Sequence, residues 1–237
     1  MTDTSTNTPS DVPGTHYTTI ATAWRPPAPS RGTRKISRRS KGSSRAVVIG
    51  YDREIHCESE MERKCALMLL ARPDVADVVE QPPAVIYRDT DGRTKRHTFD
   101  FLATMVDGSK TAIEVKPAAK VEKYGWRERL ARIARHADGL ADKFVVVTEA
   151  CLPPDEVSNA ALLHFARRDA DPELDEQIRQ AVRDLHGAVT IADLLARSGL
   201  HGDGFTAVVR LIGGGELLVH SRGRLGPSTL VSRAKPT

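Results

Sequence analysis

The first segment with a clear hydrophobic pattern repeats its apolar residues every three to four positions. In ESEMERKCALMLLA the apolar residues Met61, Cys65 and Leu69 recur at helical spacing, and the run ends before Pro73. This pattern predicts one amphipathic helix over about 57–71.

Strand-like patterns follow. VADVVEQPPAVIYRDT is rich in β-branched residues but is interrupted by Pro82-Pro83, so we expect a kinked edge strand at about 84–89. Strict alternation in HTFDFLATMV and KTAIEVK predicts two clearer strands separated by an Asp-Gly turn. Helical periodicity then returns over 120–137, and KFVVVTEA is typical of a buried strand. The expected order is helix, three strands, helix, strand.

The last third of the chain has a different texture. Helices are predicted near 155–168 and 173–186, then in TIADLLARSG with Thr190 as N-cap, and in GDGFTAVVRLIG. ELLVHSRGRLGPSTLVS is typical of two strands around a Gly/Pro turn. Three helices followed by a two-stranded ribbon indicate a winged-helix-like domain, which we place at 155–237.

Composition and charge add a third segment. The chain of 237 residues is long enough for one catalytic domain and a smaller one, and its formal net charge is +4. Residues 1–45 contain few large apolar side chains, so we expect a disordered basic arm. Its acid-free run SRGTRKISRRSKGSSR is either a phosphate-contacting tail or a solvated linker. The residues assigned to DNA contact there are Arg34, Lys35, Arg38, Arg39 and Lys41.

Several classes of site and location are disfavoured. The three cysteines form no Cys-x-x-Cys pair, so neither a zinc site nor a disulfide framework is indicated. No apolar stretch approaches the roughly 18–20 residues of a membrane span, and no signal-peptide core is present. We therefore expect a soluble cytoplasmic protein with no membrane partner.

The predicted hairpin carries the chemistry. Phe101 and Ile113 belong to apolar sets at odd positions, whereas polar groups occupy even positions such as Asp100, Glu114 and Lys116. For both apolar sets to share one face, opposed residues must have the same parity, so the loop must hold an odd number of residues. A three-residue loop, 106–108, with positive φ at its glycine, sets Asp100 opposite Glu114, with Lys116 beyond it on the same face.

Opposed carboxylates destabilise a sheet unless a cation lies between them. Hard oxygen ligands suit Mg²⁺ or Mn²⁺, which can polarise a phosphate and lower the pKa of a bound water. Lys116 is placed to orient that water or to offset negative charge on the phosphate. The structural alternative is a solvated hairpin in which Lys116 makes a weak cross-strand ion pair.

Asp100 followed by Glu114-Val115-Lys116 resembles the PD-(D/E)xK nuclease superfamily, whose core has the same element order. The stretch from Glu58 to Pro117, through ESEMERKCALMLLARPDV, EQPPAVIY and IEVKP, is similar to the TnsA-type transposase endonucleases of heteromeric Tn-seven-like transposons. The resemblance implies an α/β, restriction-endonuclease-like αβββαβ core, which we place at 46–154.

The resemblance also implies a set of site residues. Glu62, in Ser59-x-x-Glu62, completes the metal site with Asp100 and Glu114, and the Val115 carbonyl is a further candidate ligand. Glu58 lies one helical turn from Glu62 and can reach the same region. Three neighbouring positions need comment. Phe99 replaces the family's usual proline, from which we expect a packing change; Gln81 matches a Gln-Pro element near the site or makes a strand-entry hydrogen bond; and His97 is the one histidine close to Asp100.

The activity implied is hydrolysis of one DNA strand at each transposon 5′ end, beside a DDE-type transposase and an AAA-type ATPase regulator. Two alternatives stay open, namely a stand-alone restriction or repair endonuclease and a non-catalytic DNA-binding adaptor. Cations of the helix at 120–137 either contact DNA beside the site or form a solvated face with Trp126 packed inward. Those assigned to DNA are Lys120, Lys123 and Arg127. The basic C-terminal domain contacts either DNA or the ATPase.

Overall fold

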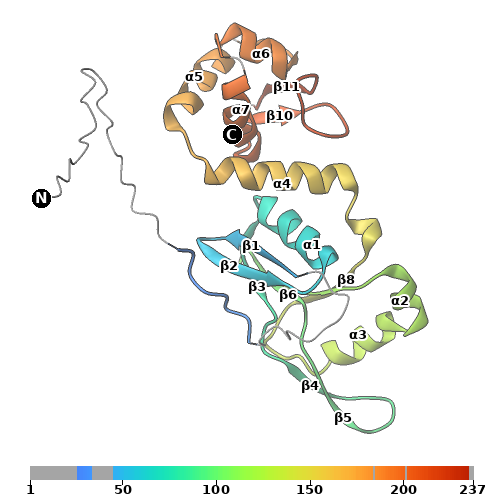
Figure 1. Cartoon of the computed structure of the whole chain (residues 1–237). Helices are drawn as coiled ribbons and strands as arrows, with labels where there is room; N and C mark the ends of the chain where they lie inside the picture. Colours follow the sequence, from blue (N-terminus) through green and yellow to red (C-terminus); the bar gives the residue numbers. More distant parts are fainter. Residues whose placement is uncertain (1–25, 34–44, 184, 201, 235–237) are drawn as a thin grey trace, which may run out of the picture.

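The structure is a computed structural model that describes residues 26–33, 45–183, 185–200 and 202–234 (Figure 1). The five arm residues assigned to DNA, from Arg34 to Lys41, lie outside the described residues. Residues 26–33 correct part of the expectation of a disordered arm, because they pack along the larger α/β unit. Ala28 N donates to Asp52 O at 2.8 Å, and Thr33 N donates to Gln81 O at 3.0 Å.

A four-stranded sheet with the order β3-β6-β7-β8 forms the centre of the larger unit. Neighbouring strands are antiparallel except β7 and β8, which are parallel. Two helices, α2 and α3, form the crossover between those parallel strands. The elements are β3 (Val75–Glu80), β6 (Phe101–Met105), β7 (Lys110–Val115), α2 (Ala118–Lys123), α3 (Trp126–Ala134) and β8 (Lys143–Val147).

The predicted edge strand at 84–89 is not the first strand of this sheet. That place belongs to β3, and β4 (Val85–Arg88) instead pairs with β5 (Thr94–His97) in a separate two-stranded ribbon. Gln81 adopts a φ of 43° and the two prolines that follow lack an N–H, so the β3 ladder cannot continue. The strand predicted in HTFDFLATMV is divided in the same way between β5 and β6.

An N-terminal hairpin precedes the first helix and was not predicted. β1 (Ala46–Gly50) pairs with β2 (Arg53–Cys57) through a turn at Tyr51-Asp52, where both residues have positive φ. Such a turn normally carries Asn or Gly, so the sequence gives no turn signal. The hairpin occupies residues up to Cys57, so helix α1 (Glu60–Ala71) begins later than the predicted start at 57. The side chain of Ser59 caps it.

The helix predicted at 120–137 is two helices. Gly125 takes a left-handed conformation with φ of 55°, which ends α2 and redirects the chain into α3. The break was not predicted because an isolated glycine leaves the apolar periodicity on either side intact.

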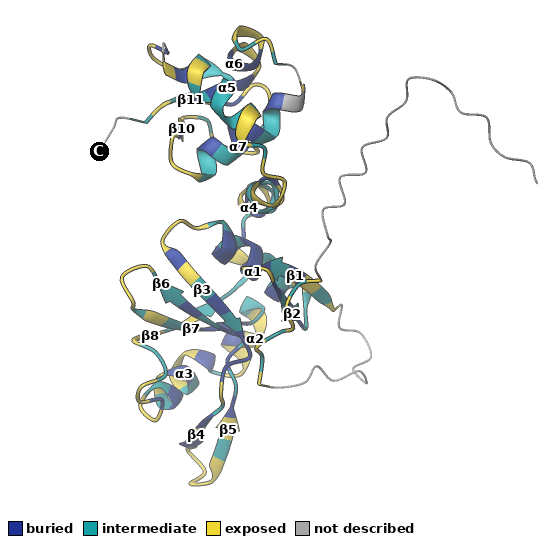
Figure 2. Ribbon diagram, turned by 90° about the vertical axis from the view of Figure 1, so that its left-hand side faces the viewer, coloured by how far each residue is buried: buried dark blue, intermediate teal, exposed yellow. Residues whose placement is uncertain are grey.

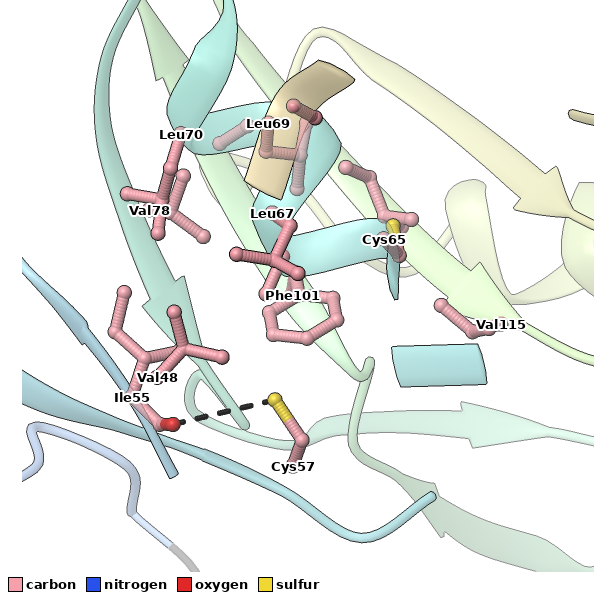
Figure 3. Packing of buried hydrophobic residues seen from close by; sticks show 14 of the residues in the cluster. Val48, Ile55, Cys57, Cys65, Leu67, Leu69, Leu70, Val78, Phe101 and Val115 are labelled. Atoms are coloured by element: carbon pink, nitrogen blue, oxygen red, sulfur yellow. Dashed lines mark hydrogen bonds between the residues drawn. The ribbon is translucent and has the colours of Figure 1, made fainter. Parts of the chain in front are cut away.

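Helices cover both faces of the sheet (Figure 2). On one face Phe101 and Val115 pack with Leu67 of α1 and with Ile55 of the hairpin (Figure 3). On the other face Ala112 packs with residues of α3 in a second core. The predicted odd-position core is thus present, but the even face is not polar throughout, because Leu102 and Ala112 pack in the second core. Phe99, an odd position that parity would place with Phe101, is instead fully buried in this second core, because β6 begins only at Phe101.

The C-terminal part of the chain forms a third core of its own. The short strand β9 joins β10 and β11 in a sheet of order β10-β11-β9, and Thr190 caps α6 as predicted. The elements are α4 (Pro154–Arg168), α5 (Pro172–Arg183), β9 (Val189–Thr190), α6 (Ile191–Arg197), α7 (Phe205–Gly213), β10 (Leu217–Val219) and β11 (Leu230–Arg233), with short 3₁₀ turns at Glu149–Cys151 and Gly202–Gly204.

Helix α4 touches both parts of the molecule. Val157 and Ala160 belong to the core built around α1, while the same helix contacts α7 (Figures 1 and 2). Arg167 donates to Leu70 O at 2.7 Å and to Gly213 O at 3.1 Å, so one guanidinium joins the ends of α1 and α7. Among the described residues, no helix combines the length and the apolarity that crossing a bilayer requires.

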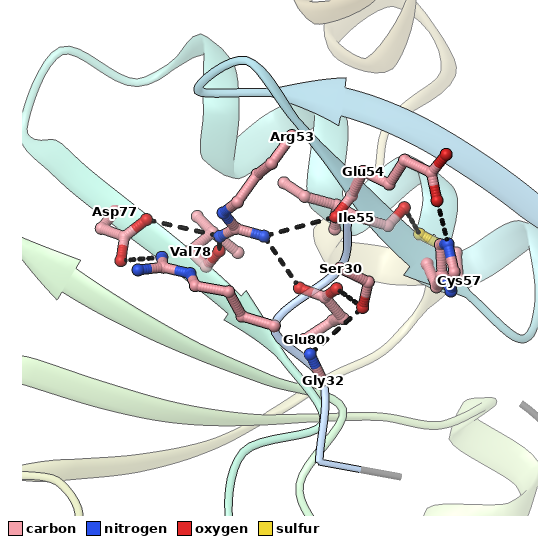
Figure 4. A network of polar contacts seen from close by, with 11 residues as sticks. Ser30, Gly32, Arg53, Glu54, Ile55, Cys57, Asp77, Val78 and Glu80 are labelled. Atoms are coloured by element: carbon pink, nitrogen blue, oxygen red, sulfur yellow. Dashed lines mark hydrogen bonds and ion pairs between the residues drawn. The ribbon is translucent and has the colours of Figure 1, made fainter. Parts of the chain in front are cut away.

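A buried polar network fixes segment 26–33 to the sheet (Figure 4). Arg53, only 5% exposed, lies 3.1 Å from Glu80 Oε2 and 3.4 Å from Asp77 Oδ1, and also donates to Val78 O. Ser30 Oγ donates to the other oxygen of Glu80. The strap, residues 26–33, thus takes part in satisfying a buried carboxylate.

Candidate active site

The hairpin β6–β7 has the register that hydrophobic parity predicts. Phe101 is opposed to Ile113, and Met105 N donates to Ser109 O at 2.8 Å, which leaves a three-residue loop at 106–108. Gly108 has φ of +84°, as the loop requires. One step beyond Phe101, Asp100 N donates to Ile113 O at 3.0 Å, so Asp100 and Glu114 are opposed.

Two carboxylates and one ammonium converge at this end of the hairpin. Lys116 Nζ lies 2.5 Å from Glu114 Oε1 and 3.3 Å from Asp100 Oδ2. Asp100 Oδ2 also accepts a hydrogen bond from Val115 N at 2.7 Å, which fixes its orientation. Glu114 is 2% exposed, so its carboxylate depends on neighbouring groups and not on bulk water.

The electrostatics of the cluster favour a protonated acid or an added cation. Burial, followed by the charges of Glu114 and Glu62, raises the pKa of Asp100 to about 7, although Lys116 opposes this. Burial lowers the pKa of Lys116, but Asp100 and Glu114 outweigh it and the net shift is upward. Lys116 therefore carries its charge at neutral pH, while Asp100 is only partly ionised.

Glu62 lies at the start of α1 and faces the same pocket. Its Oε2 accepts from Glu58 N at 2.6 Å and its Oε1 from Ser59 Oγ at 2.8 Å, while Glu62 N donates to Ser59 Oγ at 3.1 Å. This is a variant of the capping box, since the carboxylate accepts from the N–H of Glu58 and not from that of the N-cap residue Ser59, and both of its oxygens are engaged by the helix end. Burial raises the pKa of Glu62, and the two hydrogen bonds oppose that rise.

His97 is brought into the site, as its proximity to Asp100 in sequence suggested. Its Nε2 lies 2.9 Å from Glu114 Oε2, but the geometry is not that of a hydrogen bond, so both buried atoms lack a hydrogen-bond partner. The ring packs against Phe99 and Trp126. Trp126 is 7% exposed and also lies 5.4 Å from Lys116 Nζ, so it is packed inward and forms a wall of the site.

A pocket of about 570 Å³ contains these groups. Four of its residues were not singled out by sequence reasoning as part of the site. They come from the strap, from β5 and the residue after it, and from the start of α3, which the chain brings together only on folding. The predicted residues that line it are Glu58, Glu62, His97, Asp100, Glu114 and Lys116, and the unpredicted ones are Thr33, Arg96, Thr98 and Trp126.

Other predicted residues lie around the pocket without lining it. Gln81 is buried, and its backbone links Asp100 O, at 2.9 Å, to Thr33; the role of its side chain stays a prediction. Val115 O accepts from Lys116 Nζ at 3.1 Å. The three helix cations assigned to DNA contact are exposed on α2 and α3, namely Lys120, Lys123 and Arg127.

Among the residues that the structure describes, no three His, Cys, Asp or Glu side chains meet closely enough to form a metal cage. Lys116 lies within contact distance of both hairpin carboxylates, and the capping box holds the Glu62 carboxylate. The four-ligand set predicted from Glu62, Asp100, Glu114 and Val115 therefore stays a prediction.

The raised pKa of Asp100 predicts how stability depends on pH in metal-free buffer. The pKa rises from 3.8 to about 7 on folding, so between these values the folded protein binds more protons than the unfolded chain. The free energy of unfolding should then fall as pH rises through this window. In denaturant titrations with EDTA, the free energy of unfolding of Asp100→Asn should fall less with rising pH than that of the wild type. Part of the fall should remain, because the pKa of Glu62 is raised too.

Asp107→Asn is the matched control for this experiment. Hydrogen bonds from Ser109 lower the pKa of Asp107, so its contribution is lost only below the ordinary pKa range of aspartate. The control should keep the wild-type slope between about pH 4 and 7. Equal slopes in wild type and Asp100→Asn would contradict the assignment.

Comparison with known proteins adds the family. Residues 72–149 match the family model described as the TnsA-like endonuclease N-terminal domain. The match contains Asp100, Glu114 and Lys116 but begins after Glu62. A search among curated proteins returned no match. The mixed α/β fold is consistent with a TnsA-like nuclease fold, and the match over residues 72–149 supports a TnsA-type endonuclease of the PD-(D/E)xK superfamily, a nuclease related to transposition.

Proposed function

We propose that the chain is the Mg²⁺-dependent DNA endonuclease subunit of a heteromeric transposase and hydrolyses one strand at each transposon 5′ end. The observation that carries this proposal is the buried opposition of Asp100 and Glu114 with Lys116 against both, inside one polar pocket. Folding alone gives no reason to bury opposed carboxylates, whereas phosphodiester chemistry does.

The residues present fit a divalent cation. Asp100 and Glu114 offer hard oxygen donors beside the Val115 carbonyl, and Glu114 Oε2 is buried without a hydrogen-bond partner. The pKa of Asp100 is raised by Glu114 and Glu62 as well as by burial, so a cation there would relieve a repulsion that exists in the fold. When bound, Mg²⁺ supplies a Lewis acid for the phosphate and acidifies a water; Mn²⁺ should substitute.

The side chains themselves supply positioning and charge. Lys116 stays protonated and is held by Glu114, Asp100 and the Trp126 ring, so it can offset negative charge on the attacked phosphate. Asp100 is oriented by Val115 N. We assign Glu62 as the third carboxylate, which requires it to exchange its hydrogen bonds to Ser59 and Glu58.

The remaining parts are assigned to DNA and to partner proteins. The order α5, β9, α6, α7, β10, β11 supports a winged-helix-like module, which we assign to contact with DNA or an AAA-type ATPase regulator. The exposed cations on α2 and α3 are assigned to phosphate contacts beside the site. A DDE-type transposase would cut the complementary strand ends.

The test is nicking of a supercoiled plasmid that carries the transposon ends. The purified full chain is incubated with Mg²⁺, with Mn²⁺ or with EDTA, each with and without the transposase encoded beside it. We expect metal-dependent nicks at the 5′ ends only when the transposase is present. Robust cleavage without it would favour a stand-alone endonuclease, and DNA binding without nicking in any mixture would favour an adaptor.

A further inference from the structure

The ribbon β4–β5 stands apart from the central sheet. It forms its own two-stranded sheet in which Ile86 is opposed to Arg96 and Arg88 to Thr94. Figures 1 and 2 both show it extending from the nuclease unit on the side away from the C-terminal elements. An isolated two-stranded ribbon is only marginally stable, so this one depends on packing against the rest of the nuclease unit.

One face of the ribbon is anchored. Val85 and Tyr87 are buried in the core with α3. The Tyr87 hydroxyl accepts from Arg129 Nε at 3.1 Å, and Arg132 lies 3.3 Å from Asp89. The ribbon is therefore held in position before any partner arrives, which lowers the entropic cost of binding.

The opposite face points away from the protein. Directly opposed residues of an antiparallel pair lie on the same face, so Ile86, Arg88, Thr94 and Arg96 form one surface. All four are exposed, and Ile86 is 66% exposed although it is a large apolar residue. An exposed apolar side chain flanked by arginines is suited to bind a partner whose surface is both negatively charged and partly apolar.

The positive charge on the ribbon is not neutralised within the protein. Its two acids, Asp89 and Asp91, are held by Lys95 at 2.5 and 3.3 Å. Within the described part of the chain, no carboxylate forms an ion pair with Arg88, Arg93 or Arg96. Three guanidinium groups are thus free to bind an anion.

The charged face is continuous with the candidate active site. Arg96 lines the pocket that holds Asp100 and Glu114. At about 3.4 Å per residue, Thr94 and the opposed Arg88 lie about 7 Å further along the ribbon, which corresponds to roughly two base-pair steps of duplex DNA. A polyanion that leaves the pocket along the ribbon would meet successive cations.

We propose that the outward face of ribbon β4–β5 binds the DNA duplex that flanks the scissile phosphate. Arg88 and Arg96 on this face contact backbone phosphates, Arg93 in the exposed turn between the strands contacts a further phosphate, and Ile86 packs on the sugar edge beside them. The proposal rests on the proposed nuclease function, since it names the substrate contact of that same site. Backbone contacts of this kind fix the position of the duplex without reading its sequence.

The test measures DNA binding in EDTA, where no cleavage is needed. A fluorescently labelled random-sequence duplex is titrated with the full chain at several salt concentrations. Substituting all three arginines, R88A/R93A/R96A, should weaken binding roughly 10- to 100-fold and lower the slope of log K against log salt by about 2–3. R88K/R93K/R96K should retain most of the slope, because the charges remain.

A matched control removes equal charge from the opposite end of the sheet. Arg72, Lys110 and Lys143 lie near the loop at 106–108 or at the starts of β7 and β8, away from Glu114. R72A/K110A/K143A should bind DNA as the wild type does. Thermal melts of all variants establish that each is folded.

The outcomes separate this proposal from the proposed function. Wild-type salt dependence in R88A/R93A/R96A, or an equal loss in the control triple, would overturn the DNA-binding ribbon and turn the search to a protein partner. Failure of the wild type to nick any plasmid would overturn the nuclease proposal, yet the EDTA titration would still show whether the ribbon binds duplex DNA.

Discussion

Asp100→Asn and Lys116→Ala should each lower the rate of plasmid nicking by about 10²–10³-fold or more while leaving DNA binding intact. Asp100→Asn removes a charged carboxylate whose orientation is fixed by Val115 N. Lys116→Ala removes the ammonium that lies against both carboxylates. The measurement is the initial rate of supercoiled-to-nicked conversion with the transposase, beside the dissociation constant for duplex DNA.

The same hairpin supplies the controls. Asp107→Asn makes the same chemical change in the loop, and Lys110→Ala in the first position of β7, both remote from the pocket. These variants should nick at the wild-type rate. If Asp100→Asn and Lys116→Ala also leave the rate unchanged, the chemistry does not reside here and the adaptor alternative holds.

Glu62 requires a comparison with Glu58. Glu62→Gln should lower nicking more than Glu58→Gln, because only Glu62 has its carboxylate buried at the start of α1. Since the Glu62 carboxylate also accepts hydrogen bonds from Glu58 N and Ser59 Oγ, unfolding must be measured in parallel, although glutamine can still accept one of them. A rate loss in Glu58→Gln alone would transfer the role to Glu58.

Arg53→Ala should lower the free energy of unfolding by about 3–5 kcal/mol. The substitution leaves Glu80, 1% exposed, without its cationic partner, and it removes the donors to Val78 O and Asp77. Urea titrations followed by circular dichroism measure the change. Arg53→Met combined with Glu80→Met should recover most of the loss, because neither charge is then buried.

Arg72→Ala is the contrasting surface case. Its partner Asp74 lies 2.6 Å away, but both side chains are more than half exposed, so the loss should stay under about 1 kcal/mol. If Arg53→Ala proves as mild as Arg72→Ala, the buried network does not stabilise the fold and the strap is held by its backbone hydrogen bonds alone.

Sequence patterns predicted the part of the site that depends on local geometry. Parity between Phe101 and Ile113 determined the loop length and placed Asp100 opposite Glu114. Periodicity placed the start of α1 at about 57, whereas the structure begins it after the N-cap Ser59, because a local capping interaction and not the apolar spacing sets that boundary. His97 was assigned to the site from its closeness to Asp100 along the chain.

Features that depend on distant segments were not predictable in this way. β4 was expected as an edge strand of the sheet, yet φ of 43° at Gln81 and the two prolines after it place this strand in the separate ribbon. The second core was not predictable from the strand pattern, because alanine at position 112 is too small to indicate a buried face. The bond between Arg53 and Glu80 joins residues 27 positions apart, and no local period encodes it.

Arg167 couples the helix that carries Glu62 to the C-terminal unit. Its guanidinium binds carbonyls at the C-terminal ends of both α1 and α7, where the helix dipoles favour a cation. Glu62 lies near the other end of α1, less than about 18 Å away along a twelve-residue helix. A protein that binds the C-terminal unit would therefore contact, through Arg167, the end of the same helix that carries Glu62, a proposed metal ligand.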